Sequence, residues 1–96
     1  MPAESQLIES IRKTVRKAGG KVIKIHQSGF SEIGVPDLAV IMPGHGTVWV
    51  EAKAPGKRPT KVQLLKMKEI NDAGGRAFWT SDIDGFWRLL TGKGEP

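Results

Sequence analysis

The sequence predicts an α/β fold in which a mixed sheet is flanked by helices. Apolar residues recur at helical spacing in two long segments, whereas three other segments alternate or run continuously apolar over strand length. Glycine pairs and prolines separate these segments. The expected order of elements is αβββαβα, and the absence of a repeat or linker makes residues 1–96 a single domain.

The first half of the chain contains one helical segment and three strand-like segments. Glu4 to Ala18 carries an apolar stripe and is expected to form a helix that Gly19-Gly20 ends. Lys21 to His26 alternates polar and apolar residues and is expected to form a strand. Gln27 to Pro36 is rich in glycine, serine and proline and predicts a loop.

A hairpin follows this loop. Asp37 to Met42 and Thr47 to Lys53 are expected to be its strands, joined by a tight turn at Pro43-Gly44-His45-Gly46. Ala54 to Pro59 is expected to be a basic loop. Thr60 is expected to cap a helix that runs to about Asp72 and ends before Gly74-Gly75. Arg76 to Thr80 is expected to form a strand. Ser81 or Asp82 is expected to cap a short helix that runs through Leu90, and the tail from Gly92 is expected to fray.

Composition narrows the functional classes. The chain has 96 residues and no cysteine, which excludes a thiolate zinc site and a thiol nucleophile. No segment has the apolar length of a membrane span and the first residues lack the pattern of a signal peptide, so a soluble, cytoplasmic protein is expected. The net charge of +5 fits a polyanionic partner, and it fits ordinary solubility equally well.

The expected hairpin gathers three charged side chains on one face. Residues two apart in a strand share a face, so Glu51 and Lys53 project together while Val50 and Ala52 point into the core. Any antiparallel register in which paired residue numbers have an even sum places Asp37 on the face of Glu51. A sum of 88 places Asp37 directly opposite Glu51.

Two carboxylates in that arrangement repel each other, and a bound cation offsets the repulsion. Hard oxygen ligands at the end of a sheet suit Mg²⁺ or Mn²⁺, which also bind phosphate oxygens. Lys53 would then act on the attacking water or on the charge that grows at the phosphate. The simpler interpretation is that Glu51 and Lys53 form an ordinary solvated ion pair.

Further residues help to decide between a metal site and a solvated ion pair. On a helical wheel Glu4 falls within the apolar stripe and Glu9 on the opposite face, which predicts Glu4 as a third acidic group at the metal or as a charge that stabilises the helix N-terminus. Gln63 lies in the first turn of the second long helix. Basic residues cluster after the Glu-x-Lys strand, either to bind phosphates or to form a solvated face: Lys57, Arg58, Lys61, Lys66 and Lys68.

The histidines and tryptophans carry less information. His26 ends a strand near the expected site, where a structural role is favoured over contact with DNA or metal, and His45 lies in the hairpin turn. Two histidines do not make an HNH-nuclease or zinc-protease pattern. Trp49, Trp79 and Trp87 are more typical of core residues than of base-stacking platforms.

Several of these residues together resemble a known nuclease signature. Gly34-Val35-Pro36-Asp37-Leu38, then Val50-Glu51-Ala52-Lys53, then Gln63 are similar to the motifs of the VRR-NUC family, part of the PD-(D/E)xK nuclease superfamily. Many small members of that family come from bacteriophages. The similarity extends from Glu4 to about Thr80 and implies the restriction-endonuclease-like αβββαβ core, here with a short helix added at the C-terminus.

The resemblance implies a role for each motif residue. Asp37 and Glu51 would ligate a divalent metal, with the Ala52 carbonyl as an extra ligand, Lys53 would act on the water or the transition state, and Glu4 and Gln63 would complete and support the site. Lys57, Arg58 and Lys61 would contact DNA. The family implies an endonuclease acting as a homodimer on branched DNA such as four-way (Holliday) junctions, in the cytoplasm of a bacterial host if the gene is a phage gene.

Two other functions compete with this one. The same fold would also serve as a non-catalytic DNA-binding or junction-recognition module, or as a structural accessory protein. A binding module has no need for several acidic side chains to converge in a basic protein, so the acidic set favours the nuclease.

Overall fold

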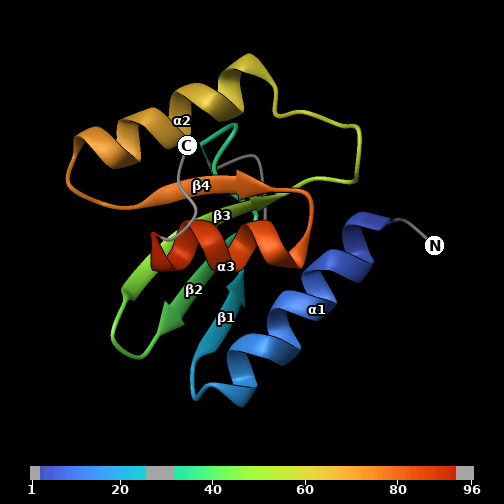
Figure 1. Ribbon diagram of the computed structural model, residues 1–96. Helices are drawn as coiled ribbons and strands as arrows, with labels where there is room; N and C mark the ends of the chain where they lie inside the picture. The colour runs from blue at the N-terminus through green and yellow to red at the C-terminus, as the bar shows by residue number, and fades with distance from the viewer. Residues whose placement is uncertain (1–2, 26–31, 93–96) are drawn as a thin grey trace.

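The computed structural model describes residues 3–25 and 32–92 and contains one four-stranded sheet with helices on both faces (Figure 1). The elements follow the expected order αβββαβα. Their bounds are α1 Ala3–Lys17, β1 Lys21–Lys24, β2 Leu38–Met42, β3 Gly46–Ala52, α2 Lys61–Asp72, β4 Ala77–Thr80 and α3 Ile83–Thr91. His26 and the tail beyond Gly92, for which a strand end and a frayed end were expected, lie outside the described residues.

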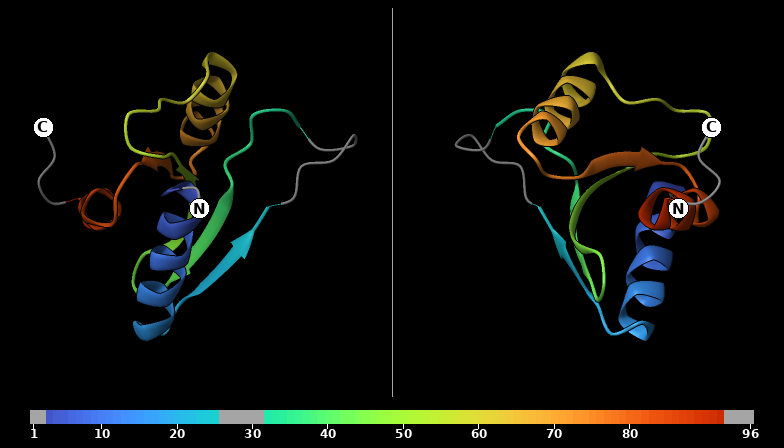
Figure 2. Two further views of the ribbon diagram at one scale, coloured as in Figure 1. Left: turned by 90° about the vertical axis from the view of Figure 1, so that its right-hand side faces the viewer. Right: turned by 60° about the vertical axis from the view of Figure 1, so that its left-hand side comes forward.

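The sheet is mixed, as the sequence predicts. Its strands lie in the order β1-β2-β3-β4; β1, β2 and β3 are antiparallel neighbours, and β4 is parallel to β3. The parallel pair is joined by the loop 53–60 and by α2, which crosses from the end of β3 to the start of β4. This crossover brings α2 over the face of the sheet opposite to α1 and α3 (Figure 2).

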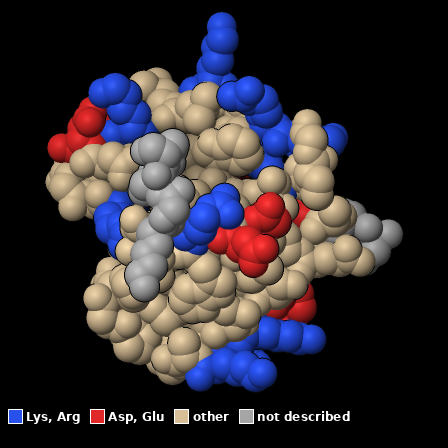
Figure 3. All heavy atoms as spheres, in the orientation of Figure 1, with Lys and Arg blue, Asp and Glu red and all other residues tan. Residues whose placement is uncertain are grey.

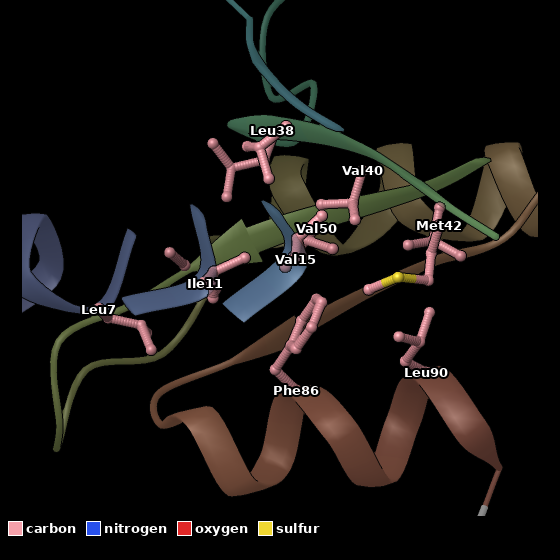
Figure 4. Packing of buried hydrophobic residues seen from close by; sticks show 12 residues of the cluster. Leu7, Ile11, Val15, Leu38, Val40, Met42, Val50, Phe86 and Leu90 are labelled. Carbon is pink, nitrogen blue, oxygen red and sulfur yellow. The ribbon is translucent and has the colours of Figure 1, made fainter. Parts of the chain in front are cut away.

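The core lies between the sheet and the pair α1 and α3. Helix α1 buries Leu7, Ile11 and Val15, while α3 buries Phe86 and Leu90 against the same strands (Figure 4). The strands contribute alternate apolar residues to this layer, namely Val22, Leu38, Val40, Met42, Val48, Val50 and Ala52. The period-2 pattern of β3 therefore buries its even-numbered residues here and leaves the odd-numbered ones on the α2 face.

Local signals in the sequence account for the element ends. Thr60 caps α2, and a full capping box forms because Gln63 donates to the Thr60 side chain and accepts from the Thr60 backbone. Asp82, one of the two expected residues, caps α3. Gly20 follows α1 at a point where a Cβ atom would lie 2.5 Å from the Ile41 carbonyl oxygen, so no other residue fits there without a shift.

The described helices include none that is both long enough and apolar enough to cross a membrane.

Candidate active site

The register of the β2–β3 hairpin places Asp37 opposite Glu51. Leu38 pairs with Val50 and Val40 with Val48, so paired numbers sum to 88. Asp37 precedes β2 by one residue, and its carbonyl oxygen still accepts a hydrogen bond of 2.7 Å from the Ile25 amide, which continues the ladder with β1. The next position of the register therefore sets Asp37 across from Glu51, as the sequence analysis anticipated.

Both carboxylates lie in a poorly solvated environment. Glu51 is only 2% exposed and is one of the largest fully buried side chains of the protein. Glu51 Oε1 and Asp37 Oδ2 are each buried without a hydrogen-bond partner among the described residues. Buried carboxylate oxygens of this kind cost free energy unless a cation or a donor satisfies them.

Two neighbours contact the other oxygen of Glu51. Lys53 Nζ lies 3.8 Å from Glu51 Oε2, with its side chain 16% exposed, and Gln63 Nε2 donates to the same oxygen over 3.3 Å. The interpretation of Glu51 and Lys53 as a solvated ion pair is therefore wrong, because α2 covers this face and buries the pair. A contact at 3.8 Å leaves the ammonium of Lys53 free to reach another group.

Gln63 serves the fold and the site with the same amide. Its Oε1 accepts from the Thr60 amide at 2.9 Å, which completes the capping box, while its Nε2 faces Glu51. The first turn of α2 is therefore fixed relative to β3. Sequence spacing placed Gln63 in that turn but gave no sign of its double contact, because capping boxes are usual in helices that carry no site.

The environment changes the acidity of Glu51. The pKa of Glu51 rises from 4.5 to about 7, because burial raises it most and the negative charge of Asp37 adds to the rise, while Lys53 opposes it. Near neutral pH Glu51 is therefore poised between its neutral and its ionised form. A carboxylate that resists ionisation in this way is typical of a functional site.

Gly34 fixes the approach of the motif segment to α2. Its backbone has φ of +88°, and a Cβ atom there would lie 2.6 Å from Val62 Cγ1 and 3.0 Å from the Val62 carbonyl oxygen. Only glycine satisfies both the conformation and the contact. The chain then reaches buried Pro36 and Asp37 from a position held against the second residue of α2.

Glu4 lies at the same end of the molecule but outside this cluster. It is half-buried in the first turn of α1, whereas Glu9 is exposed, in agreement with the helical wheel. Figures 1 and 2 show the N-terminal end of α1 at the same end of the protein as the C-terminal end of β3. Nevertheless, residues 3–25 and 32–92 contain no group of three or more acidic or histidine side chains arranged to hold a metal ion. A metal role for Glu4 stays a prediction, as does one for the carbonyl of Ala52.

The basic cluster after β3 divides into two sets. Lys66 pairs with Glu32 at 3.1 Å and Glu69 at 3.4 Å, and Lys68 pairs with Asp72 at 2.7 Å, so these lysines are neutralised locally. Lys57, Arg58 and Lys61 are exposed, and no ion pair links them to another described residue. The charges of the second set are therefore not neutralised by any described residue.

The tryptophans and His45 differ in their surroundings. Trp87 packs edge-on against Phe86 at 5.4 Å and supports the core, as expected. Trp79 pairs with Glu51 in the parallel register and is half-buried, and Trp49 is half-buried on the same face. His45 donates its backbone amide to Met42 within the hairpin turn, far along the strand from Glu51.

The chain is similar to a phage protein and to two solved structures. No family model matches the chain. The chain is 39% identical over 61 residues to a protein of Acyrthosiphon pisum secondary endosymbiont phage 1 named "Putative nuclease p44", covering 64% of this chain and 63% of that protein, slightly less than two thirds of its length.

Two solved structures have the same fold. One, described as a VRR_NUC domain, is 25% identical with a TM-score of 0.80 and covers 95% of this chain and 97% of that one. The other, a VRR_NUC domain protein, is 15% identical with a TM-score of 0.72 and covers 92% and 88% of the two chains. The expected resemblance to the VRR-NUC family is thereby confirmed, together with the mixed-sheet α/β fold.

The raised pKa of Glu51 predicts a pH-dependent stability in the absence of metal. Because folding raises this pKa from 4.5 to about 7, the stabilising contribution is complete below pH 4.5 and is lost as the pH rises through 7. The rise corresponds to on the order of 3 kcal/mol. We expect Glu51→Gln in EDTA to match the wild type near pH 4 and to exceed its free energy of unfolding at pH 8, as measured by urea titration. An equal pH dependence in both proteins would contradict the burial of Glu51.

Two substitutions separate the contact of Gln63 with Thr60 from its contact with Glu51. Gln63→Glu retains an acceptor for the capping box but places a third carboxylate beside Glu51, so the pKa of Glu51 should rise further. Thr60→Ala removes the hydroxyl that accepts from the Gln63 amide and should cost about 1 kcal/mol, but it keeps the Thr60 amide that orients the Gln63 side chain, so the Glu51 titration should stay unchanged. Carbon-13 NMR titration of the Glu51 carboxyl group in EDTA measures both effects. Identical Glu51 titration curves in wild type and Gln63→Glu would disprove the contact.

Proposed function

We propose that this protein is a metal-dependent DNA endonuclease whose active centre is formed by Asp37, Glu51 and Lys53. The observation that carries the proposal is the pair of buried carboxylates, each with an oxygen that lacks a partner among the described residues, beside a lysine ammonium. The VRR_NUC fold and the name of the phage relative support a nuclease over other phosphoryl-transfer chemistry.

The donor set fits a hard divalent cation. Glu51 Oε1 and Asp37 Oδ2 supply two carboxylate oxygens from opposite strands, which suits Mg²⁺ or Mn²⁺ bound partly by water. Ala52, next to Glu51, would add a backbone carbonyl and Glu4 a third carboxylate. Such a cation supplies an acidified water and neutralises charge on the scissile phosphate. It would also relieve the repulsion between the two carboxylates.

The protein's own residues would then position and stabilise the reacting groups. Lys53 has one carboxylate contact at 3.8 Å and retains hydrogen-bond donors for the attacking water or for a phosphate oxygen. Gln63 holds the orientation of Glu51 through Oε2, so that Oε1 keeps its direction. Gln63 lies in the first turn of α2, and Lys53 directly follows β3 with its amide bonded to the Thr80 carbonyl oxygen at 3.0 Å, so both side chains start from ordered backbone, which favours preorganised chemistry.

The substrate is proposed to be DNA with a branched structure, with junctions as one form. Lys57, Arg58 and Lys61 lie in and just after the loop 53–60, where exposed cations that have no acidic partner among the described residues would bind the backbone near the cleaved bond. The family resemblance supports a homodimer, which would present two such centres to two strands. It also supports action on DNA in the cytoplasm of a host cell.

The alternative is a DNA-recognition module that retains the fold without catalysis. This alternative is energetically disfavoured, because the opposed carboxylates destabilise the metal-free protein near neutral pH. They also do not contribute to the binding of phosphate. Selection for binding alone would replace Asp37 or Glu51 with a neutral residue.

Removal of the charge of Lys53 or of Asp37 should abolish DNA cleavage and preserve DNA binding. We expect Lys53→Ala and Asp37→Asn to lose at least about a hundredfold in cleavage rate, the scale of one electrostatic catalytic group. Labelled single-stranded, duplex, flap and four-way-junction DNA in Mg²⁺, Mn²⁺ or EDTA provides the assay, and binding is measured on the same DNA in EDTA. Arg88→Gln, exposed on α3, is the control. Wild-type cleavage in EDTA, or equal rates in Lys53→Ala, would overturn the proposal.

The third acidic group is tested by a matched pair of variants on α1. Glu4→Gln should strongly reduce cleavage and should lessen the rise in melting temperature produced by Mn²⁺, because a bound metal stabilises the folded state by mass action. Glu9→Gln, exposed on the same helix, should be close to neutral in both measurements. Damage by Glu9→Gln and not by Glu4→Gln would exclude Glu4 as a ligand.

A further inference from the structure

A second basic surface lies at the end of the sheet far from the acidic pair. Residues 10–25 contain six of the 15 basic residues of the chain and no acidic residue. Four of the six lie on the C-terminal half of α1 and two on β1, which packs against α1. We call this set the α1–β1 basic surface: Arg12, Lys13, Arg16, Lys17, Lys21 and Lys24.

The charges of this surface are not used inside the protein. No ion pair joins any of the six to another residue of 3–25 or 32–92. Five of the side chains are exposed, and half-buried Arg12 makes a single long hydrogen bond of 3.5 Å to the Val22 carbonyl oxygen. Arg16 and Lys17 also stabilise the C-terminal end of α1, but that effect does not explain the lysines on the strand.

The surface is hollowed where the helix meets the strand. Arg12, Arg16 and Lys21, together with Gly20 and Val22, line a depression of about 250 Å³. Three cationic side chains from two elements around one depression suit a phosphate group with its hydration water, whereas a flat solvated face would spread such charges apart. Figure 3 shows basic side chains gathered over the lower end of α1, separate from those around α2.

The position of the surface relates it to the candidate active site. Lys21 pairs with Ile41, which pairs with Thr47, and Glu51 follows Thr47 by four residues on the same face of β3. Four residues along a strand and two strands across the sheet give a backbone separation of about 17 Å. At 3.4 Å per base pair this is roughly five base pairs of duplex.

We propose that the α1–β1 basic surface binds the phosphate backbone of a duplex arm about five base pairs from the cleaved bond. This inference rests on the proposed function for the position of the cleaved bond. The surface would hold a duplex arm without reading its sequence, since phosphate contacts fix position and not base identity. Single-stranded DNA, which lacks a rigid backbone at that distance, would gain less from it.

Two double variants test the surface against a charge-matched control. Arg16→Gln with Lys21→Gln removes two charges at the depression, and Lys13→Gln with Lys17→Gln removes two exposed charges on α1 alone. Lys68→Gln with Arg88→Gln removes the same charge elsewhere. Fluorescence anisotropy in EDTA measures the binding of a labelled duplex of about 20 base pairs, roughly two helical turns, and of a single strand of equal length. Circular dichroism verifies folding.

The expected result is a selective loss of duplex binding. At about 0.1 M salt the Arg16/Lys21 variant should bind duplex roughly tenfold or more weakly, and the slope of log K against log salt should fall by about 1.8, or 0.9 for each lost contact. The Lys13/Lys17 variant should change in the same direction, and the control should stay close to wild type. Single-strand binding should change least.

Other outcomes separate failure of this inference from failure of the nuclease. Metal-dependent cleavage by all variants, with duplex affinities and salt slopes like those of the control, would overturn the surface and leave the nuclease. If the Arg16/Lys21 variant selectively loses duplex binding and the wild-type protein cleaves no DNA, the result would support the proposed surface and overturn the proposed nuclease. Loss of binding to phosphatidylserine vesicles or RNA, with unchanged duplex binding, would assign the surface to another polyanion and overturn the proposal.

Discussion

The opposition of Asp37 and Glu51 across a hairpin is the constraint on which the site depends. A one-residue slip of register would move one of the two carboxylates to the other face of the sheet, into the apolar layer of α1 and α3. The register is held because Val40, Val48 and Val50 are fully buried in that layer, and a slip would replace them with residues of the other face. The core thus enforces the contact between like charges, and its packing provides the free energy that the contact costs.

The crossover from β3 to β4 converts this contact into an enclosed centre. Since α2 must span the parallel pair, it passes over the face that carries Glu51 and excludes water from it. Enclosure raises the pKa of Glu51 and strengthens its interactions with Lys53 and Gln63. Lys57 and Arg58 of the loop 53–60 lie outside this enclosure and stay exposed to water.

The sequence was sufficient for the parts of the structure that depend on local periodicity. Element order and the Thr60 cap follow from spacing and turn residues, and strand ends differ by one or two residues because ladders fray. The observed hairpin register, with a sum of 88, was one of the even registers that the sequence allowed. The burial of Glu51 was not predictable, since α2 is weakly amphipathic and its sequence does not define the face that docks. The ion pair between Lys66 and Glu32 could not be predicted either, because it joins segments that are far apart in the chain.

Because one glutamine amide joins the helix cap to Glu51, the integrity of the first turn of α2 and the geometry of the centre are a single cooperative unit. Helix ends are among the first parts of a protein to open in local fluctuations. Each opening of that turn would release Glu51 from its orientation before the core has lost any packing. A partly unfolded molecule would therefore lose the geometry of the proposed active centre while its core is still packed.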